Sequence, residues 1–261
     1  VYMARQISKQ RDYLHDFKEL FWHVLGPLIL VCVLILPNNF STAALVFING
    51  LVLMFVGKIR IKFIAAIIGF AFVGALTIYA TAKFTPLGTK IMPRSATWVS
   101  RIDSYFVDAK GDEQTKDFQQ TQALVAIQNG GMTGVGPGKS TQRNILPYSS
   151  SDFIYAIIIE EYGLFGGVLA LLFYLILMFR AIRIALRVES VFGSLLATGL
   201  MFSLVFQALI NMLVSVEVLP VTGQTLPLIS MGGTSIVFSC IAIGIVLSVS
   251  RDATDRKYEK A

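Results

Sequence analysis

Charged residues are scarce in this sequence. They make up 15% of the 261 residues, whereas a soluble domain carries about a quarter. Cysteine and histidine occur only twice each. Cys32 and Cys240 both lie in apolar runs, and His15 and His23 have no further ligand at a metal-binding spacing. The scarcity of charge argues against a soluble domain, and the cysteines and histidines exclude a disulfide framework and a zinc motif.

Long apolar runs dominate the chain instead. Hydrophobic residues make up 55% of the sequence, and a helix needs about 20 such residues to cross a bilayer. We therefore predict an all-α polytopic membrane protein, a helical bundle forming a single membrane domain over residues 1–261. The six predicted spans cover residues 20–36, 40–57, 61–82, 153–179, 192–216 and 228–250. The apolar start of the chain, Val1–Ala4, resembles the end of an earlier span, so we expect preceding spans to be missing.

The basic residues predict the topology. Fourteen of the 22 lysines and arginines lie in four segments, residues 5–18, 58–62, 180–187 and 251–260. Because basic residues in short loops stay cytoplasmic, both ends of the chain are predicted inside and the long connection 83–152 outside. Its second half, near residues 119–128, is apolar enough for an interfacial or re-entrant helix. The net charge of +6 then reflects membrane topology, and we expect no nucleic-acid partner.

A glycine-rich segment in this connection is similar to a nucleotide-binding loop. Gly134–Ser140 reads Gly-Val-Gly-Pro-Gly-Lys-Ser, but Thr133 stands where the motif requires glycine, and no strand precedes it. A nucleoside triphosphate site is therefore excluded. The backbone amides of the segment still suit an anion-binding concavity.

Two acidic positions follow this segment. Asp152 directly precedes an apolar run, where aspartate is a favoured helix N-cap, but a carboxylate at the outer membrane face can also accept a proton. Both roles remain open and can coexist. Glu160 lies about 12 Å further along an ideal helix, too far to share a proton with Asp152. An ionisable residue inside a span indicates either a polar cavity or a buried hydrogen bond.

Two segments together carry a family resemblance. Leu146–Tyr155 reads Leu-Pro-Tyr-Ser-Ser-Ser-Asp-Phe-Ile-Tyr, and Leu219–Ser235 is rich in proline and glycine. They resemble the SEDS family (shape, elongation, division and sporulation) of bacterial cell-wall glycosyltransferases, over nearly the whole chain. Thr225–Ser230 is more similar to the division branch of the family than to its elongation branch. In this family the aspartate before the helix is the proposed general base, which corresponds to Asp152.

Six residues are candidates for substrate binding: Arg101, Gln122, Lys139, Gln142, Arg143 and Glu160. Gln122 and Gln142 match polar positions of the family pattern, whereas Lys139, Arg143 and Glu160 are candidates because of their charge and their place in the chain. Arg101 begins an Arg-x-x-x-Phe pattern, and with Lys139 and Arg143 it is expected to hold a pyrophosphate; solvated loop charges are the alternative. Two family acids and a histidine are absent, because Pro37–Thr42 and residues 147–151 depart from the family pattern. Asp152 remains as the acid of that pattern.

The activity implied is that of a peptidoglycan glycosyltransferase. Such a protein polymerises lipid II and releases undecaprenyl pyrophosphate, with a class B penicillin-binding transpeptidase and other division proteins as partners. We expect it in the bacterial cytoplasmic membrane at the division site. We expect no tightly bound cofactor and leave open a divalent cation, Mg²⁺ or Mn²⁺, whose ligands the sequence does not indicate. A lipid-linked precursor flippase and a non-catalytic division scaffold are the alternatives.

Overall fold

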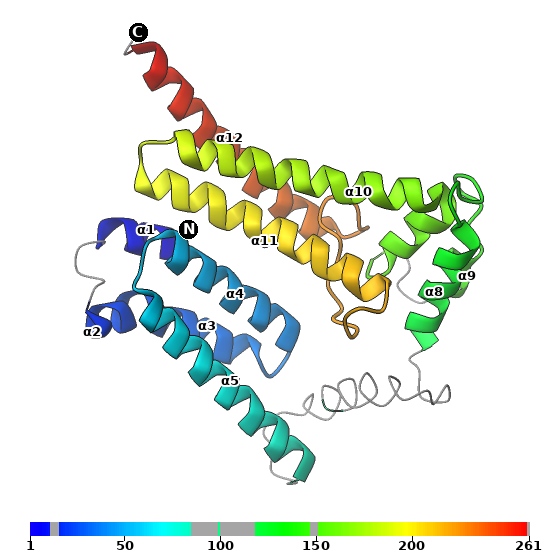
Figure 1. The fold of residues 1–261 in the computed structure, drawn as a ribbon, viewed down its shortest axis with the longest axis horizontal. Helices are drawn as coiled ribbons and strands as arrows, with labels where there is room; N and C mark the ends of the chain where they lie inside the picture. The colour runs from blue at the N-terminus through cyan, green and yellow to red at the C-terminus, as the bar shows by residue number, and fades with distance from the viewer. Residues whose placement is uncertain (11–15, 85–98, 100–117, 147–150, 260–261) are drawn as a thin grey trace. The chain divides into compact units, whose positions relative to one another are not determined.

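The computed structural model describes residues 1–10, 16–84, 99, 118–146 and 151–259. Every regular element within these ranges is a helix, which confirms the predicted all-α class (Figure 1). Arg101 and most of the first half of the long connection lie outside the described residues. The chain forms two compact units, and each is described by itself. The first unit comprises residues 1–103, 184–199 and 252–261, and the second comprises residues 104–183 and 200–251.

The first unit contains the N-terminal helices. They are α1 (Tyr2–Lys9), α2 (Phe17–Leu20), the π-helical turn Phe21–Leu25, α3 (Gly26–Ile35), α4 (Phe40–Val56) and α5 (Ile61–Phe84). Asn39 caps α4 by accepting a hydrogen bond from the Thr42 amide at 3.1 Å. A Cβ added to Gly50 of α4 would lie 2.6 Å from a methyl group of Leu28 and 3.3 Å from Met3. This glycine therefore lets α1, α3 and α4 pack closely.

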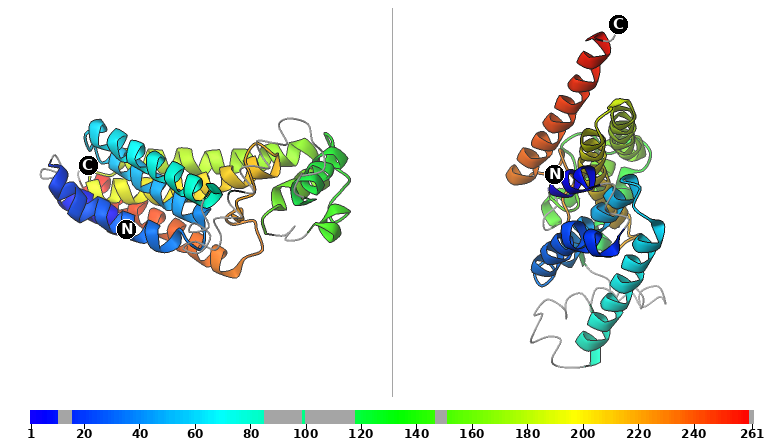
Figure 2. Two further views of the ribbon diagram at one scale, coloured as in Figure 1. Left: turned by 90° about the horizontal axis from the view of Figure 1, so that it is seen from below. Right: turned by 90° about the vertical axis from the view of Figure 1, so that its left-hand side faces the viewer.

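The second unit contains most of the remaining helices. They are α8 (Phe118–Gly130), α9 (Gln142–Ile145), and the larger parts of α10 (Ile154–Arg187), α11 (Val191–Ser215) and α12 (Gly233–Glu259). Tyr174 of α10 packs among apolar side chains of α11, and these two helices lie side by side in both views of Figure 2. Ala123 and Ala126 of α8 are fully buried against Phe153. These small side chains bring α8 close to the start of α10.

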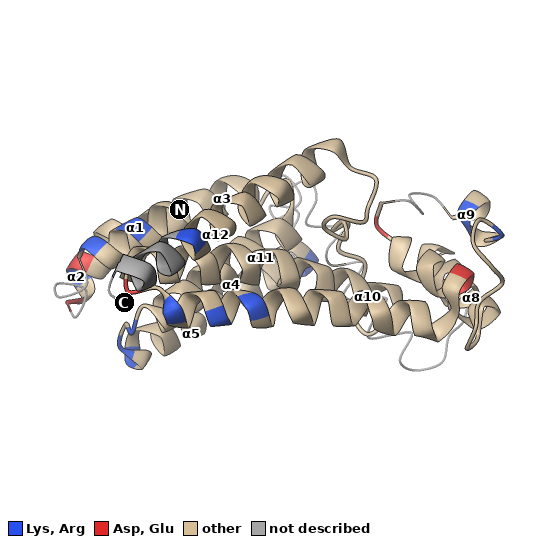
Figure 3. Cartoon of the chain, turned by 90° about the horizontal axis from the view of Figure 1, so that it is seen from above, with Lys and Arg blue, Asp and Glu red and all other residues tan. Residues whose placement is uncertain are grey.

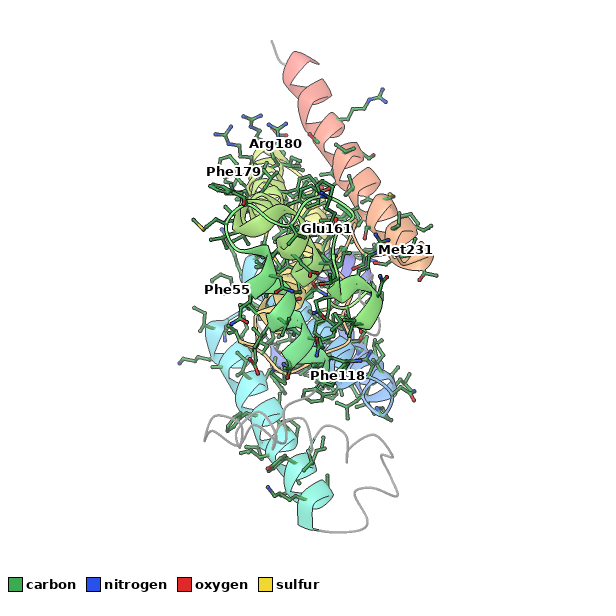
Figure 4. All side chains as sticks on the ribbon, turned by 90° about the vertical axis from the view of Figure 1, so that its right-hand side faces the viewer. Phe55, Phe118, Glu161, Phe179, Arg180 and Met231 are labelled. Atoms are coloured by element: carbon green, nitrogen blue, oxygen red, sulfur yellow. The ribbon has the colours of Figure 1, made fainter. Side chains whose placement is uncertain are left out.

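Five helical segments in the described part of the chain are long and apolar enough to cross a membrane. They are Phe17–Ile35, Ile61–Lys83, Ile154–Arg187, Val191–Ser215 and Gly233–Arg251. The remaining predicted span, 40–57, corresponds to α4, a shorter apolar helix of 17 residues. Large apolar side chains such as Phe55, Phe179 and Met231 are exposed (Figure 4), as expected for surfaces facing lipid.

The ends of the last predicted spans differ from the structure. The final helix begins at Gly233 rather than 228, because Leu228 has a φ of 70° and the Ser230 amide turns back to the carbonyl of Leu226 at 2.9 Å. α10 continues past the predicted residue 179 to Arg187, and its last turns carry three arginines. Figure 3 shows blue, basic positions toward one end of α10 and red, acidic positions toward the other.

Candidate functional site

The helix α10 is interrupted at Gly163, where φ is 70° and ψ is −173°. Residues with a Cβ rarely adopt this positive φ, so glycine suits the break. The backbone groups around the break are paired with the connection between α8 and α9, residues 131–141, called here the glycine connection. The three hydrogen bonds are Leu164 N to Gly131 O (2.9 Å), Val135 N to Glu160 O (2.9 Å) and Gly136 N to Glu161 O (3.0 Å). A broken helix at membrane depth requires such partners.

The glycines allow the two backbones to come this close. A Cβ added to Gly130, Gly134 or Gly163 would overlap backbone atoms of the opposite segment. Glu161 lies among the green ribbons of α8, the glycine connection and the start of α10 in Figure 4. The amides of the glycine connection at 134, 135, 136 and 139 all donate to backbone carbonyls. The prediction that backbone amides of this segment bind an anion is therefore wrong for these four amides, because each already donates to a backbone carbonyl.

Glu160 lies at the centre of this crossing. Its side chain is 1% exposed, and its carboxylate accepts five hydrogen bonds. The donors are Asn129 Nδ2 (3.5 Å), Ser140 Oγ, Thr141 N (3.3 Å), Thr141 Oγ1 (3.0 Å) and Gln142 N (3.3 Å). Both carboxylate oxygens are therefore bonded to groups from the end of α8 and from Ser140–Gln142. Of the two roles left open for Glu160, a polar cavity and a buried hydrogen bond, the structure shows the hydrogen bonding, which holds the end of the glycine connection.

The other predicted substrate-binding residues lie around Glu160 or apart from it. Lys139 is exposed and bends back over Gly136, with its Cδ 3.4 Å from where a Cβ of that glycine would lie. The Arg143 side chain is also exposed, and its amide donates to Ser140 Oγ at 3.0 Å. Gln142 is buried, and its amide oxygen finds no donor in the described part of the chain. Gln122 is half-buried on α8 and is not among the residues bonded to Glu160.

Asp152 has different surroundings. Its side chain is half-buried, and Oδ1 accepts a hydrogen bond from Ser151 Oγ at 2.8 Å, the one side-chain bond recorded for this carboxylate among the described residues. α10 begins at Ile154, two residues further on, so Asp152 does not act as the N-cap in the described structure. Oδ2 faces Gly223, where an added Cβ would lie 3.8 Å away. The carboxylate therefore keeps acceptor capacity beside a residue that has no side chain.

The connection between α11 and α12, residues 216–232, is held beside Asp152 by side chains of neighbouring helices. Four of its carbonyls accept from Gln120 (Leu219 O, 3.3 Å), Asn211 (Gln224 O, 2.7 Å), Gln207 (Thr225 O, 3.0 Å) and Tyr174 (Pro227 O). In addition, Ser230 Oγ donates to the carbonyl of Ser151 at 2.6 Å and accepts from the amide of Leu226 at 2.7 Å. Residues 151–155 and the α11–α12 connection thus form one site.

Two polar side chains of α11 join these segments. Gln207 and Asn211 are four residues apart in an apolar run, a spacing that predicts hydrogen bonding between helices. In the structure their amides bond to the α11–α12 connection, and Asn211 also bonds to the carbonyl of Asp152 at 2.7 Å. Their spacing of four residues on an apolar helix was the available signal. Which backbone they contact depends on how the connection folds.

The two carboxylates can support different chemistry. Asp152 is partly accessible, with spare acceptor capacity, as a general base requires. Glu160 lies within α10, is buried, and accepts hydrogen bonds at both oxygens. In the described ranges, no group of three or more histidine, cysteine, aspartate or glutamate side chains is placed to hold a metal ion.

The apolar helices and the polar site at the start of a broken helix define a multi-pass membrane protein. Comparison with known proteins identifies its family, because the model of the cell cycle protein family of FtsW, RodA and SpoVE matches residues 1–255. The chain therefore belongs to this family and is a multi-pass protein of the bacterial inner membrane.

Curated relatives agree with this assignment. The chain is 33% identical over 252 residues to stage V sporulation protein E of Bacillus subtilis (strain 168), covering 96% of the chain and 65% of the relative. It is also 33% identical over 258 residues to the probable peptidoglycan glycosyltransferase FtsW of Methylococcus capsulatus, covering 97% of the chain and 61% of the relative. The chain thus spans less than two thirds of the length of these relatives.

Two solved structures share the fold. One chain, from a peptidoglycan synthase complex, has a TM-score of 0.70 at 24% identity and is matched over 96% of this chain and 66% of its own length. A mutant of the rod shape determining protein RodA from Thermus thermophilus has a TM-score of 0.57 at 21% identity, with 96% and 62% covered. These likenesses establish the FtsW and RodA fold for the chain.

Proposed function

We propose that this protein polymerises lipid II into glycan strands outside the cytoplasmic membrane and releases undecaprenyl pyrophosphate. Family membership supports the proposal, as does the name probable peptidoglycan glycosyltransferase of several relatives. The observation that carries it is the Asp152 carboxylate, which is half-buried, accepts one recorded hydrogen bond and faces Gly223. This arrangement supplies a partly accessible base with acceptor capacity to spare.

In the proposed reaction Asp152 accepts the proton of the 4-hydroxyl on the acceptor sugar. The resulting oxygen nucleophile forms a bond with the anomeric carbon of the donor, and the bond from that carbon to the pyrophosphate oxygen breaks. The negative charge that develops on the pyrophosphate requires cationic partners. Lys139 and Arg143 are exposed on either side of the segment bound by Glu160, which supports their assignment to this role. Arg101 keeps the same proposed role from the sequence pattern.

We assign Gln122 and Gln142 to the substrate pocket only through the family pattern. Glu160 contributes to that pocket by holding Ser140–Gln142 in place, since its own oxygens are occupied. A divalent cation, Mg²⁺ or Mn²⁺, is left open; if bound with the substrate, it would supply further positive charge to the leaving group. We propose no tightly bound cofactor.

The proposed partners and location follow from the same reaction. Strands made from lipid II must be crosslinked, so we propose a class B penicillin-binding transpeptidase as partner, together with other division proteins. The chain with a TM-score of 0.70 comes from a peptidoglycan synthase complex that coordinates polymerisation and crosslinking, which supports this partner class. The sequence similarity to the division branch supports placement at the division site.

A polymerisation assay tests the proposal. Purified full-length protein with its transpeptidase is supplied with fluorescent lipid II, and the products are separated by length. We expect glycan strands from the wild type and none above background from Asp152→Asn. The same preparations in vesicles are tested for transfer of lipid II between leaflets. Transfer without polymerisation would replace the proposal with a flippase, and neither activity would leave a scaffold.

The proposed orientation has a separate test. With both chain ends cytoplasmic, a cysteine replacing Asn144 should react with an impermeant thiol reagent from outside the cell. Cysteines replacing Arg60 or Arg183 should react only after the membrane is opened. Labelling of all three from the same side would contradict this topology and the placement of Asp152 at the outer face.

A further inference from the structure

Asn211 of α11 connects the proposed base to the opposite wall of the site. Its side chain is 1% exposed, and the amide nitrogen donates one hydrogen to the carbonyl of Asp152 and one to the carbonyl of Gln224, both at 2.7 Å. Gln224 follows Gly223, the residue that the Asp152 carboxylate faces. One buried amide therefore links the backbone of the base to the segment that its carboxylate faces.

The orientation of this amide is determined by its partners. Both partners are backbone carbonyls, which only accept hydrogen bonds, so the NH₂ group must point toward them. The side-chain oxygen then points elsewhere and has no donor among the described residues. The Asn211 amide is fully buried and donates its two hydrogens to two separate segments. Losing either bond would leave a buried donor unpaired, which costs free energy of folding.

We propose that Asn211 is a positioning residue for Asp152. Its two hydrogen bonds hold the base at a fixed distance from the α11–α12 connection, so that the carboxylate meets the acceptor hydroxyl in a reactive geometry. A displacement of about 1 Å at a reacting group can cost a factor of about 10² in rate. The inference rests on the proposed function of Asp152 and adds a residue that does not itself touch the substrate.

The chain provides a matched control one turn earlier on the same helix. Gln207 donates its side-chain amide to the carbonyl of Thr225 at 3.0 Å, the residue after Gln224. It therefore holds the same connection through the same chemistry, but its recorded bonds do not reach Asp152. If these amides only stabilise the connection, Asn211→Ala and Gln207→Ala should affect catalysis alike.

The test compares the two alanine variants in the lipid II polymerisation assay. We expect Asn211→Ala to lower kcat by about 10- to 100-fold with little change in KM. Gln207→Ala should lower kcat by far less, although both lose a bond to the connection. Equal losses in kcat, or a loss confined to KM, would overturn the positioning role. Should Asn211→Ala not fold, Asn211→Gln and Gln207→Asn provide the same comparison, since each retains an amide on a side chain of different length.

A second readout does not depend on polymerisation. A cysteine in place of Asp152 is labelled with a thiol reagent in the wild-type, Asn211→Ala and Gln207→Ala backgrounds. We expect the labelling rate to change severalfold only with Asn211→Ala, because only that change releases the backbone of residue 152. The same rate in all three backgrounds would refute the inference whatever the activity. If labelling changes as expected but Asp152→Asn still polymerises lipid II, the proposed base is wrong and the positioning contact stands.

Discussion

The two carboxylates at and just before the start of α10 have different surroundings. Glu160 is 1% exposed and accepts five hydrogen bonds, from four residues around the glycine connection. Asp152 is half-buried and accepts one, from its neighbour Ser151. At Asp152 the backbone carbonyl, rather than the carboxylate, makes the long-range bond that fixes the residue.

This difference distinguishes a structural carboxylate from a reactive one. A buried carboxylate surrounded by donors stabilises the segments that supply them and has few acceptor sites left for a substrate. A carboxylate whose backbone is fixed while its oxygens remain accessible is prepared to act as a base. Ionisable residues inside a membrane span are commonly taken as functional, yet here the more deeply buried acid is the structural one.

The largest effect is expected from Asp152→Asn. Asparagine keeps an oxygen that can accept from Ser151, and the fold does not depend on a helix cap here, so the thermal midpoint should be unchanged. Polymerisation of lipid II should fall by about 10²- to 10⁴-fold, because an amide cannot take the proton. Asp152→Glu serves as the charge-preserving control. Wild-type turnover in the asparagine variant would show that Asp152 is not the base.

Glu160→Gln should produce the opposite result, mainly a loss of stability. The NH₂ group of the glutamine would replace a carboxylate oxygen that accepts hydrogen bonds, so that two donors would face each other. Leaving such buried donors unpaired costs about 1–3 kcal/mol. The measurement is thermal unfolding in detergent, with Glu161→Gln as control for the loss of one negative charge at the next position. An unaltered midpoint in Glu160→Gln, or an equal loss in Glu161→Gln, would contradict the structural role.

Smaller effects on activity are expected from the exposed cations. Lys139→Ala and Arg143→Ala should each slow polymerisation by about two- to fivefold, the range for one solvated charge interaction, without altering the thermal midpoint. Initial rates at several lipid II concentrations provide the measurement. Lys58→Ala, at an exposed lysine of the first unit, controls for a general effect of charge. If neither variant slows the reaction, these side chains are ordinary loop charges.

The smallest effect should come from Asn129→Ala within the Glu160 cluster. Its amide lies 3.5 Å from the carboxylate, the longest of the five bonds, and the residue is exposed. Stability should therefore change by no more than about 0.5 kcal/mol. Ser140→Ala removes a buried donor from the same carboxylate and should cost more in the same unfolding assay. Equal costs would mean that burial does not decide which bonds to Glu160 matter.

Much of the fold could be predicted from the chain alone. Apolar runs and basic loops predicted six spans, five of which correspond to helices of spanning length and one to the shorter α4. The glycine segment stands out in the sequence, but the amides of Val135 and Gly136 pair with α10, and those of Gly134 and Lys139 with Gly130 and Gly136, instead of binding an anion. No local pattern shows that Gly130, Gly134 and Gly163 meet, because their closeness depends on two backbones crossing.

The sequence by itself determined the membrane class, the family resemblance and the choice of Asp152, because hydrophobicity and short motifs are local properties of the chain. Only the tertiary structure assigned the roles of Glu160 and Asn211. Each depends on donors or acceptors from distant segments, such as the carbonyls of Asp152 and Gln224 that share one amide. A buried polar group is defined by its partners, and those partners are adjacent only after the chain has folded.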